Sequence, residues 1–283
     1  MSREGRKLKT IEPMNAVSPF IMVNRSGASN LFSDRIEITA AEKYILKKRA
    51  EGLKGFGMLH LFLAAYVRTV SQRPGINRFI RGQRIYARNN IEIQMTIKKT
   101  LRLDAPETCI NAEYTPDCTA DDIYHIFNKL VDDFKNTDAE NDFDVAAKVL
   151  RFIPGVLLKF VVHLLKTLDY FGLLPRFLTK LSPFHGSFFI TSMGSLGIPP
   201  VFHHLYDFGN LPVFLSYGAK YDEYSIEKDG SVTKHRYIDF NVVTDERICD
   251  GHYYASAFKY LKSVLKNPEV LDNPPEKIVE DIK

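Results

Sequence analysis

The chain has 283 residues, 45% of them hydrophobic, so it is long and apolar enough to fold around a substantial core. Its net charge of +4 is small for this length and its basic residues are scattered, which argues against nucleic-acid binding. The three cysteines form no Cys-x-x-Cys pair, so neither a disulfide framework nor a zinc site is expected.

Residues 1–18 are predicted to form a polar N-terminal arm. The first residues are basic, but no apolar stretch follows them, so the segment does not have the pattern of a signal peptide. Together with the unpaired cysteines, this favours a reducing, cytoplasmic location.

A loop, a strand and two helices are predicted next. Ser, Gly and Asn dominate 24–33, which indicates a loop, and 35–38 alternates between apolar and polar residues as a strand does. Thr39 is followed by Glu42 in the spacing of a capping box, which predicts a helix over 40–53. The stretch 58–70 is apolar on most helical faces, so this second helix is expected at the centre of the core.

Two strands and a third helix follow. Segments 84–87 and 91–97 have strand patterns, and the second alternates Ile and Met with polar residues, which predicts one buried and one solvated face. Thr119 and the acidic residues after it predict a helix start, with the helix running to about residue 134.

The stretch 144–180 is predicted to be helical. Runs of Leu, Val and Phe between 149 and 178 are interrupted by Lys159, His163 and Lys166, which fall on one helical face and leave the uncharged run too short to span a membrane. We expect a helical hairpin packed on the body or on a neighbouring subunit. The alternative is a lid or a membrane-surface element, because a basic stripe opposite Leu and Phe is typical of interfacial helices.

The last third is predicted to be mostly strand. Residues 211–217 are typical of a buried strand, and 226–232 of a hairpin around an Asp-Gly turn. The alternating strand 237–243 then runs into an Asp-Gly corner at Asp250, after which an amphipathic helix spans 252–266.

Two motifs resemble those of the CoA-dependent acyltransferases, the family of chloramphenicol acetyltransferase and of the catalytic domain of the 2-oxoacid dehydrogenase acyltransferases. The run Gly-Ser-Phe-Phe-Ile-Thr-Ser-Met-Gly at 186–194 is similar to the family's Gly-Thr-Phe-Thr-Ile-Ser-Asn-Leu-Gly. Residues 246–251 are Glu-x-x-x-Asp-Gly where the family has His-x-x-x-Asp-Gly. The resemblance implies an α/β two-layer sandwich with a mixed β-sheet over 19–272, interrupted by a helical insert at about 144–180 and followed by a C-terminal tail at 273–283.

The same resemblance implies a set of catalytic residues. Glu246 stands where the family's His takes the thiol proton, and Thr191 carries the hydroxyl that in the family stabilises the oxyanion. Asp250 is expected to be buried and bonded to an arginine, either Arg25 or Arg35.

The identity of the base is left open by the sequence. Burial of Glu246 would raise its pKa and make it a working base, whereas pairing with Arg247 would lower the pKa and leave a structural anchor. His252 is the nearest substitute in sequence, although a helix N-terminus weakens its proton affinity. His203 and His204 precede an Asp in a similar spacing, but a pair of loop histidines is the expected interpretation.

Two further residues are expected to be structural. His60 lies in the central helix and is expected to be a hydrogen-bonded core residue. Cys249 is next to Asp250, but the resemblance implies a cysteine without a nucleophilic role.

The implied activity is transfer of an acyl group between a CoA-type thioester and an unknown acceptor, without a tightly bound cofactor or metal. The implied assembly is a homotrimer in which Glu246 of one chain faces Thr191 of the next. The alternative is a catalytically inactive relative that acts as a trimeric binding or scaffold protein, with possible membrane-surface contact through 149–178. No nucleic-acid partner is expected.

Overall fold

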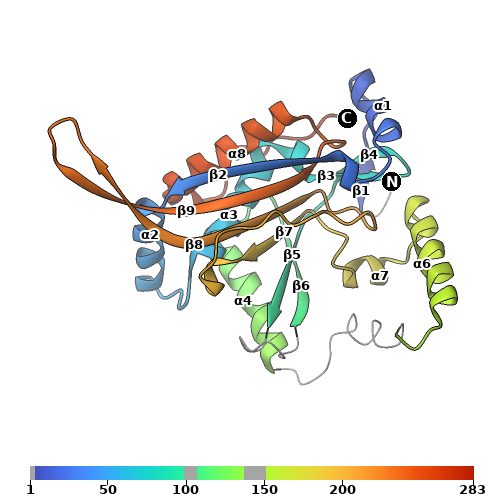
Figure 1. Ribbon diagram of the computed structural model, residues 1–283, viewed down its shortest axis with the longest axis horizontal. Coiled ribbons are helices and arrows are strands. Elements are labelled where there is room, and N and C mark those ends of the chain that lie inside the picture. The colour runs from blue at the N-terminus through green and yellow to red at the C-terminus, as the bar shows by residue number, and fades with distance from the viewer. Residues whose placement is uncertain (1–3, 99–106, 137–150) are drawn as a thin grey trace.

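The computed structural model describes residues 4–98, 107–136 and 151–283 (Figure 1). Within these residues, the body is a six-stranded mixed sheet with helices on one face. The strands in spatial order are β2 (Ser29–Glu37), β9 (Val232–Asp245), β8 (Val213–Ile226), β7 (Phe188–Ser192), β5 (Ile91–Lys98) and β6 (Glu107–Tyr114). β7 is parallel to both of its neighbours, and the other pairs are antiparallel. The predicted α/β fold with a mixed sheet is therefore confirmed.

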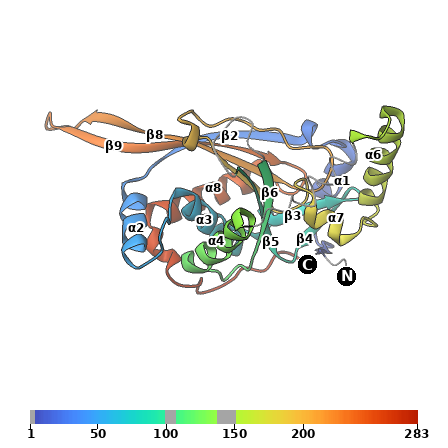
Figure 2. The same cartoon turned by 90° about the horizontal axis from the view of Figure 1, so that it is seen from below.

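Four helices cover the same face of the sheet (Figure 2). They are α2 (Thr39–Ala50), α3 (Met58–Gln72), α4 (Ala120–Asn136) and α8 (Gly251–Lys266). α3 is buried along almost its whole length, as its sequence predicted. Tyr66 stacks on Phe188 with ring centroids 3.7 Å apart, and Phe62 stacks on Tyr217 at 4.8 Å. These ring contacts bind α3 to β7 and β8, the strands that carry the candidate site.

A smaller sheet joins the two ends of the chain. Its order is β1 (Gly5–Lys7), β4 (Arg84–Arg88) and β3 (Arg78–Arg81), so the N-terminal arm, which also forms α1 (Pro13–Ile21), contributes a paired strand. The tail, which was expected to be loose, packs against this sheet: Asp281 forms an ion pair with Arg78 at 2.5 Å, and the backbone of Thr10 donates to the carbonyl of Lys283 at 2.8 Å.

Several element boundaries differ from the predictions. The predicted loop at 24–33 becomes strand from Ser29, because every residue of β2 pairs with β9. The capping box at Thr39 is not formed, since Glu42 instead pairs with Lys220 and Arg236. Thr119 does cap α4, exchanging hydrogen bonds with Asp122. The hairpin of β8 and β9 is longer than predicted and extends beyond the helical layer.

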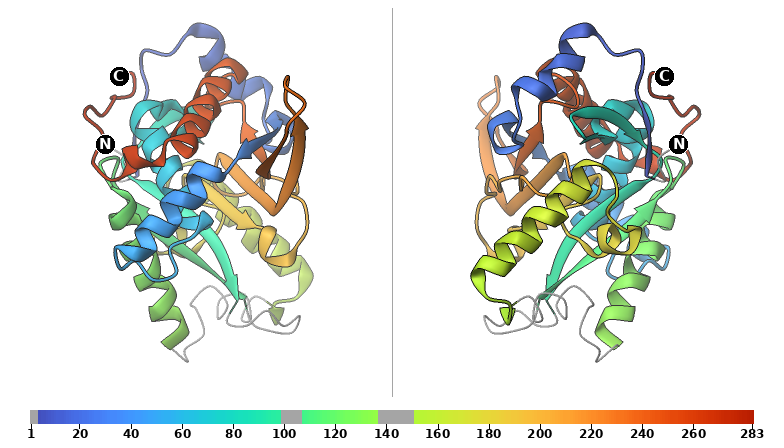
Figure 3. Two further views of the ribbon diagram at one scale, coloured as in Figure 1. Left: turned by 90° about the vertical axis from the view of Figure 1, so that its left-hand side faces the viewer. Right: turned by 90° about the vertical axis from the view of Figure 1, so that its right-hand side faces the viewer.

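The described part of the insert forms α6 (Gly155–Tyr170) and α7 (Arg176–Leu181), as predicted; residues 144–150 lie outside the described ranges. α6 has no buried residue and lies at one end of the molecule, away from the helical layer (Figures 1 and 2); it faces the viewer in the right-hand view of Figure 3. Its C-terminal end is attached through the Tyr170 hydroxyl, which donates to Gln83 at 2.9 Å. Across the described ranges, every helix is too short or too polar to traverse a lipid bilayer.

The remaining elements are short 3-10 helices that connect the larger ones. They are η1 (Ser26–Ala28), η2 (Pro74–Asn77), η3 (Gly194–Leu196) and η4 (Pro268–Leu271).

Candidate functional site

Thr191 lies near the end of β7 and points away from the helical layer. Phe188 and Ile190 are buried against the helices, and side chains alternate between the two faces of a strand, so Phe189 and Thr191 belong to the opposite face. Thr191 is opposite Ser216 of β8 in the parallel register. The strand thus presents the candidate hydroxyl on the sheet face that the helices leave open.

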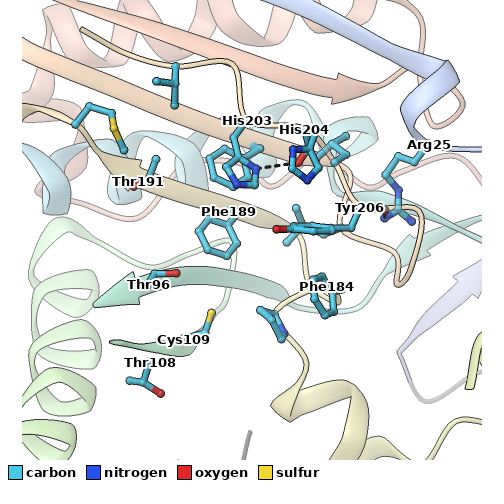
Figure 4. A pocket seen from close by; sticks show the side chains of 16 residues that line it. Arg25, Thr96, Thr108, Cys109, Phe184, Phe189, Thr191, His203, His204 and Tyr206 are labelled. Atoms are coloured by element: carbon cyan, nitrogen blue, oxygen red, sulfur yellow. Dashed lines mark hydrogen bonds between the residues drawn. The ribbon is translucent and has the colours of Figure 1, made fainter. Parts of the chain in front are cut away.

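A cavity of about 410 Å³ lies over this face (Figure 4). Its walls are largely aromatic and apolar, and a few polar side chains from the strands and from the loop before β8 also line it. Its lining includes Thr96, Thr108 and Cys109 from β5 and β6, Phe189 and Thr191 from β7, Phe214 from β8, Phe184, and His203, His204 and Tyr206 from the loop before β8. Such a combination is typical of a small-molecule site.

The loop over the cavity is held to the sheet by hydrogen bonds. Ser216 accepts from the backbone N–H of Val201 at 2.9 Å and donates to its carbonyl at 2.5 Å, while Asn241 donates to the carbonyl of Pro200 at 3.2 Å. A Cβ on Gly218 would lie 2.7 Å from the ring of Pro200, so only glycine permits this close approach. The histidines that follow are therefore fixed relative to Thr191.

His203 is the half-buried member of the histidine pair. Its ring stacks on Phe214 with centroids 4.2 Å apart and planes 7° apart, and Phe214 stacks on Phe189 in the same way at 4.7 Å. The Nδ1 atom of His203 lies 2.9 Å from the carbonyl oxygen of His204. Burial lowers the pKa of His203 below its usual value, and the hydrogen bond to the carbonyl of His204 offsets this only in part.

Glu246 is not part of this cavity in its own chain. Its side chain is exposed, and its backbone N–H donates to the carbonyl of Ala28 at 2.9 Å. In the register of the sheet, Thr191 of β7 lies opposite Ser216 of β8, which in turn lies opposite Asn241 of β9. Each strand residue advances about 3.3 Å, so Glu246 lies roughly 17 Å further along β9. The predicted approach of Glu246 to Thr191 of a neighbouring chain stays a prediction.

The prediction that Asp250 is buried and bonded to an arginine is wrong. Asp250 is exposed and caps the N-terminus of α8, accepting from the backbone N–H of Tyr253 at 2.7 Å. His252, in the first turn of this helix, is exposed as well. Arg35, the alternate partner, pairs instead with Glu223 on the surface. An Asp at a helix start can bond to backbone N–H groups, and here this local interaction replaces a long-range one.

The buried carboxylate of the corner is Asp245, which is 2% exposed. Arg247 contacts it at 2.7 Å, and the Nε atom of Arg25 lies 3.4 Å away. Arg25 also donates to the carbonyl of Tyr206 at 2.5 Å and to that of Gly209. Burial lowers the pKa of Arg25, which Asp245 partly offsets. Arg25 was expected to pair with Asp250, but it instead joins Asp245 to the loop over the cavity.

The prediction that His60 is a hydrogen-bonded core residue is confirmed, and Cys249 is buried. His60 is buried, accepts from the backbone N–H of Gly57 at 3.2 Å and contacts Asn128 at 3.2 Å. Cys249 is 5% exposed, and burial raises the pKa of its thiol, which disfavours the reactive thiolate. Among the described residues, no group of three or more His, Cys, Asp or Glu side chains is arranged to hold a metal ion.

Comparisons with known proteins find similarity in structure alone. No protein-family model matches the chain, and no curated protein matches it in sequence. Among solved structures, it is similar to a probable dihydrolipoamide acetyltransferase from Listeria monocytogenes, with 14% identity over 92% of this chain and 95% of that one and a TM-score of 0.59.

Two other solved structures are similar over almost their whole length. A truncated catalytic core of the 2-oxoacid dehydrogenase complex from Thermoplasma acidophilum has 11% identity, covers 93% of this chain and 99% of that one, and gives a TM-score of 0.56. A chloramphenicol acetyltransferase has 15% identity, covers 91% and 96%, and gives 0.53. The chain therefore has the fold shared by chloramphenicol acetyltransferase and the catalytic cores of the 2-oxoacid dehydrogenase acyltransferases.

Proposed function

We propose that this protein transfers an acyl group between a CoA-type thioester and an acceptor, and that the reaction takes place in the cavity beside Thr191. The observation that carries the proposal is the position of the Thr191 hydroxyl. It lies in the motif that resembles the family's, on the open face of the sheet, and lines a cavity of about 410 Å³.

Thr191 has the chemistry required of an oxyanion donor. When a nucleophile attacks a thioester, the carbonyl oxygen becomes negatively charged, and a fixed hydroxyl can donate a hydrogen bond to it. Phe189, Phe214 and Met193 surround the same space. Apolar walls exclude water and strengthen such a charge-assisted hydrogen bond.

A second cavity supports a substrate that carries phosphate groups. It measures about 260 Å³, shares Arg25 with the first cavity, and is also lined by Arg81, Lys166 and Arg247. Two aspartates line it as well, Asp169 and Asp207, and the arginines pair with Asp245 and Glu4, so N–H donors rather than a net positive charge are what the cavity offers to phosphate. We place the phosphates of CoA on this side, with the thioester directed toward Thr191.

We also propose a homotrimer in the cytoplasm, with Glu246 at the subunit boundary. Several apolar side chains are exposed around the mouth of the cavity, which supports a subunit contact there; they are Leu196, Ile198, Val201, Phe202 and Tyr206. The three cysteines are unpaired, which supports a reducing compartment.

The test combines binding with turnover. CoA binding is measured by calorimetry, and release of free CoA thiol is followed with acetyl-, octanoyl- and palmitoyl-CoA in the presence of thiol, hydroxyl and amine acceptors. We expect binding of CoA and acceptor-dependent release of the thiol from at least one thioester. A protein that neither binds CoA nor consumes any thioester contradicts the proposal.

The second candidate is that the protein is catalytically inactive and acts as a binding or scaffold protein at a membrane surface. The exposed apolar side chains of α6 favour it. Val156, Leu157, Phe160 and Leu164 are 46–88% exposed. Residues 151–181 carry five Lys or Arg and one Asp, which suits an anionic lipid surface.

Co-sedimentation with phosphatidylserine vesicles tests this candidate. Phe160→Asp is expected to abolish binding, while Leu46→Asp, at a 63% exposed position of α2, leaves binding unchanged. Equal sedimentation with neutral vesicles, or none with either kind, contradicts it.

A further inference from the structure

We infer that His203 is the proton acceptor of the acyl transfer and that it acts in the same chain as Thr191. The inference rests on the proposed function and names a base that the sequence motif does not. His203 and Thr191 line one cavity, whereas Glu246 does not line it.

The hydrogen bond of His203 decides which ring nitrogen is available. A carbonyl oxygen can only accept, so the Nδ1 atom, 2.9 Å from the carbonyl of His204, must carry the proton of the neutral ring. The Nε2 atom then has a lone pair to receive a proton. This arrangement is required of an imidazole that acts as a general base.

The ring is also held in place. Its stack on Phe214, which itself stacks on Phe189, restricts rotation about both side-chain bonds. Phe189 is two residues before Thr191 on the same face of β7. The hydroxyl and the imidazole are thus positioned by one rigid patch of the sheet, which limits the reorganisation needed at each turnover.

Burial, more than the surrounding charges, keeps the imidazole neutral. The titratable groups that line the cavity are His204 and Tyr206 on the same loop, Cys109 on β6, and Arg25. No carboxylate is among the described residues of the lining; the carbonyl of His204 favours the imidazolium, but burial outweighs it. Burial lowers the pKa of His203, and at neutral pH the ring is in the form that accepts a proton.

The proposed transfer begins at the acceptor. The Nε2 atom of His203 takes the proton of an acceptor thiol or hydroxyl, whose sulfur or oxygen forms a bond to the thioester carbonyl carbon. The carbonyl π electrons move to the oxygen, which receives a hydrogen bond from Thr191. On collapse the C=O bond reforms, the C–S bond to CoA breaks, and the imidazolium returns its proton to the leaving thiolate.

Three variants test the assignment in the full-length protein. His203→Phe preserves the aromatic stack but has no proton acceptor. His203→Asn keeps a donor for the His204 carbonyl but has no Nε2 lone pair. His125→Phe changes an exposed histidine of α4, outside the cavity, and is the control. We expect CoA affinity within about 3-fold of wild type in all three. A positioned base contributes about 10²–10⁴-fold, so kcat should fall at least about 100-fold in both His203 variants and little in the control.

The pH profile separates proton transfer from a structural effect. In the wild type, kcat/KM should fall at low pH with an apparent pKa below about 6.5, the ordinary histidine value, and a separate NMR titration of the His203 ring in the free protein should give the same pKa. The residual activity of His203→Phe should lack that limb.

Two failures are distinguishable. Wild-type turnover that survives in both His203 variants, or that is lost in Glu246→Gln instead, overturns the assignment to His203 while the acyl transfer stands. Absence of CoA binding and turnover in the wild type contradicts the proposed function and, with it, the assignment.

Discussion

At the scale of single residues, the role proposed for the Thr191 hydroxyl applies only at the step in which negative charge develops on the substrate. Thr191→Val keeps the shape of the side chain but removes the donor. We expect kcat to fall about 10²–10³-fold, as when an oxyanion donor is lost elsewhere, with little change in CoA affinity. Thr191→Ser retains the hydroxyl and should remain within about 10-fold of wild type. Steady-state kinetics and calorimetry measure both; equal losses in the two variants would show that packing, not hydrogen bonding, is responsible.

The two aspartates of the corner differ in burial, and their contributions to stability should differ accordingly. Asp245→Asn leaves Arg25 and Arg247 without their buried carboxylate, and breaking a buried ion pair costs about 3–5 kcal/mol. Asp250→Ala removes only a helix cap, which costs about 0.5–2 kcal/mol. Urea unfolding of both variants measures the difference. A larger effect at Asp250 would restore the role that the sequence motif suggested.

At the scale of elements, the ends of α2, α4 and η4 are joined by an ion-pair cluster around Asp272. Its carboxylate contacts Lys47, Lys48 and Tyr44 at 2.7–2.8 Å, and Lys48 also contacts Asp121 of α4. Burial alone would raise the pKa of Asp272, but these hydrogen bonds outweigh it and lower the pKa to about 2. The charged form of Asp272 therefore favours the folded state.

The pH dependence follows from the sign of that shift. The folded pKa of about 2 is below the unfolded value of about 3.9, so the stabilisation is complete above about pH 4 and is lost as pH falls toward 2. We expect Asp272→Asn to be less stable than wild type at pH 7, with the difference shrinking between pH 4 and 2. Glu269→Gln, which removes an exposed carboxylate of η4 outside the cluster, is the control. Urea midpoints across this range test it.

Strong local patterns predicted the elements well. The apolar stretch at 58–70 is α3, the alternation at 91–97 is β5, and Thr119 caps α4. Tertiary pairing decided the rest. Ser29 and Asn30 are typical of a loop but lie in β2, because β9 offers an unpaired edge beside them. The tail is ordered by Arg78, about 200 residues earlier, a contact that no local pattern contains.

The candidate site was predictable in part for the same reason. Thr191 follows from a motif and from strand alternation. His203 does not, because its relation to Thr191 depends on the bonds of Ser216 to Val201 and on the stack over Phe214. The motif also predicted that Asp250 is buried, whereas the buried carboxylate is that of Asp245. The motif thus predicted the course of the backbone correctly, but only the structure shows which aspartate is buried and paired with arginine.

At the scale of the whole molecule, the distribution of exposed apolar side chains predicts where subunits meet. The helical layer covers one face of the sheet, while the mouth of the cavity on the other face exposes Val201 at 40% and Phe202 at 45%. Burying apolar surface in a subunit contact stabilises that contact by about 25 cal/mol per Å². We therefore expect the trimer to form across this face. Phe202→Asp should yield monomers in light scattering, with a circular dichroism spectrum like that of wild type. Leu46→Asp, on the helical side, should remain trimeric. Trimers in Phe202→Asp and monomers in Leu46→Asp would place the interface on the helical layer, away from the cavity.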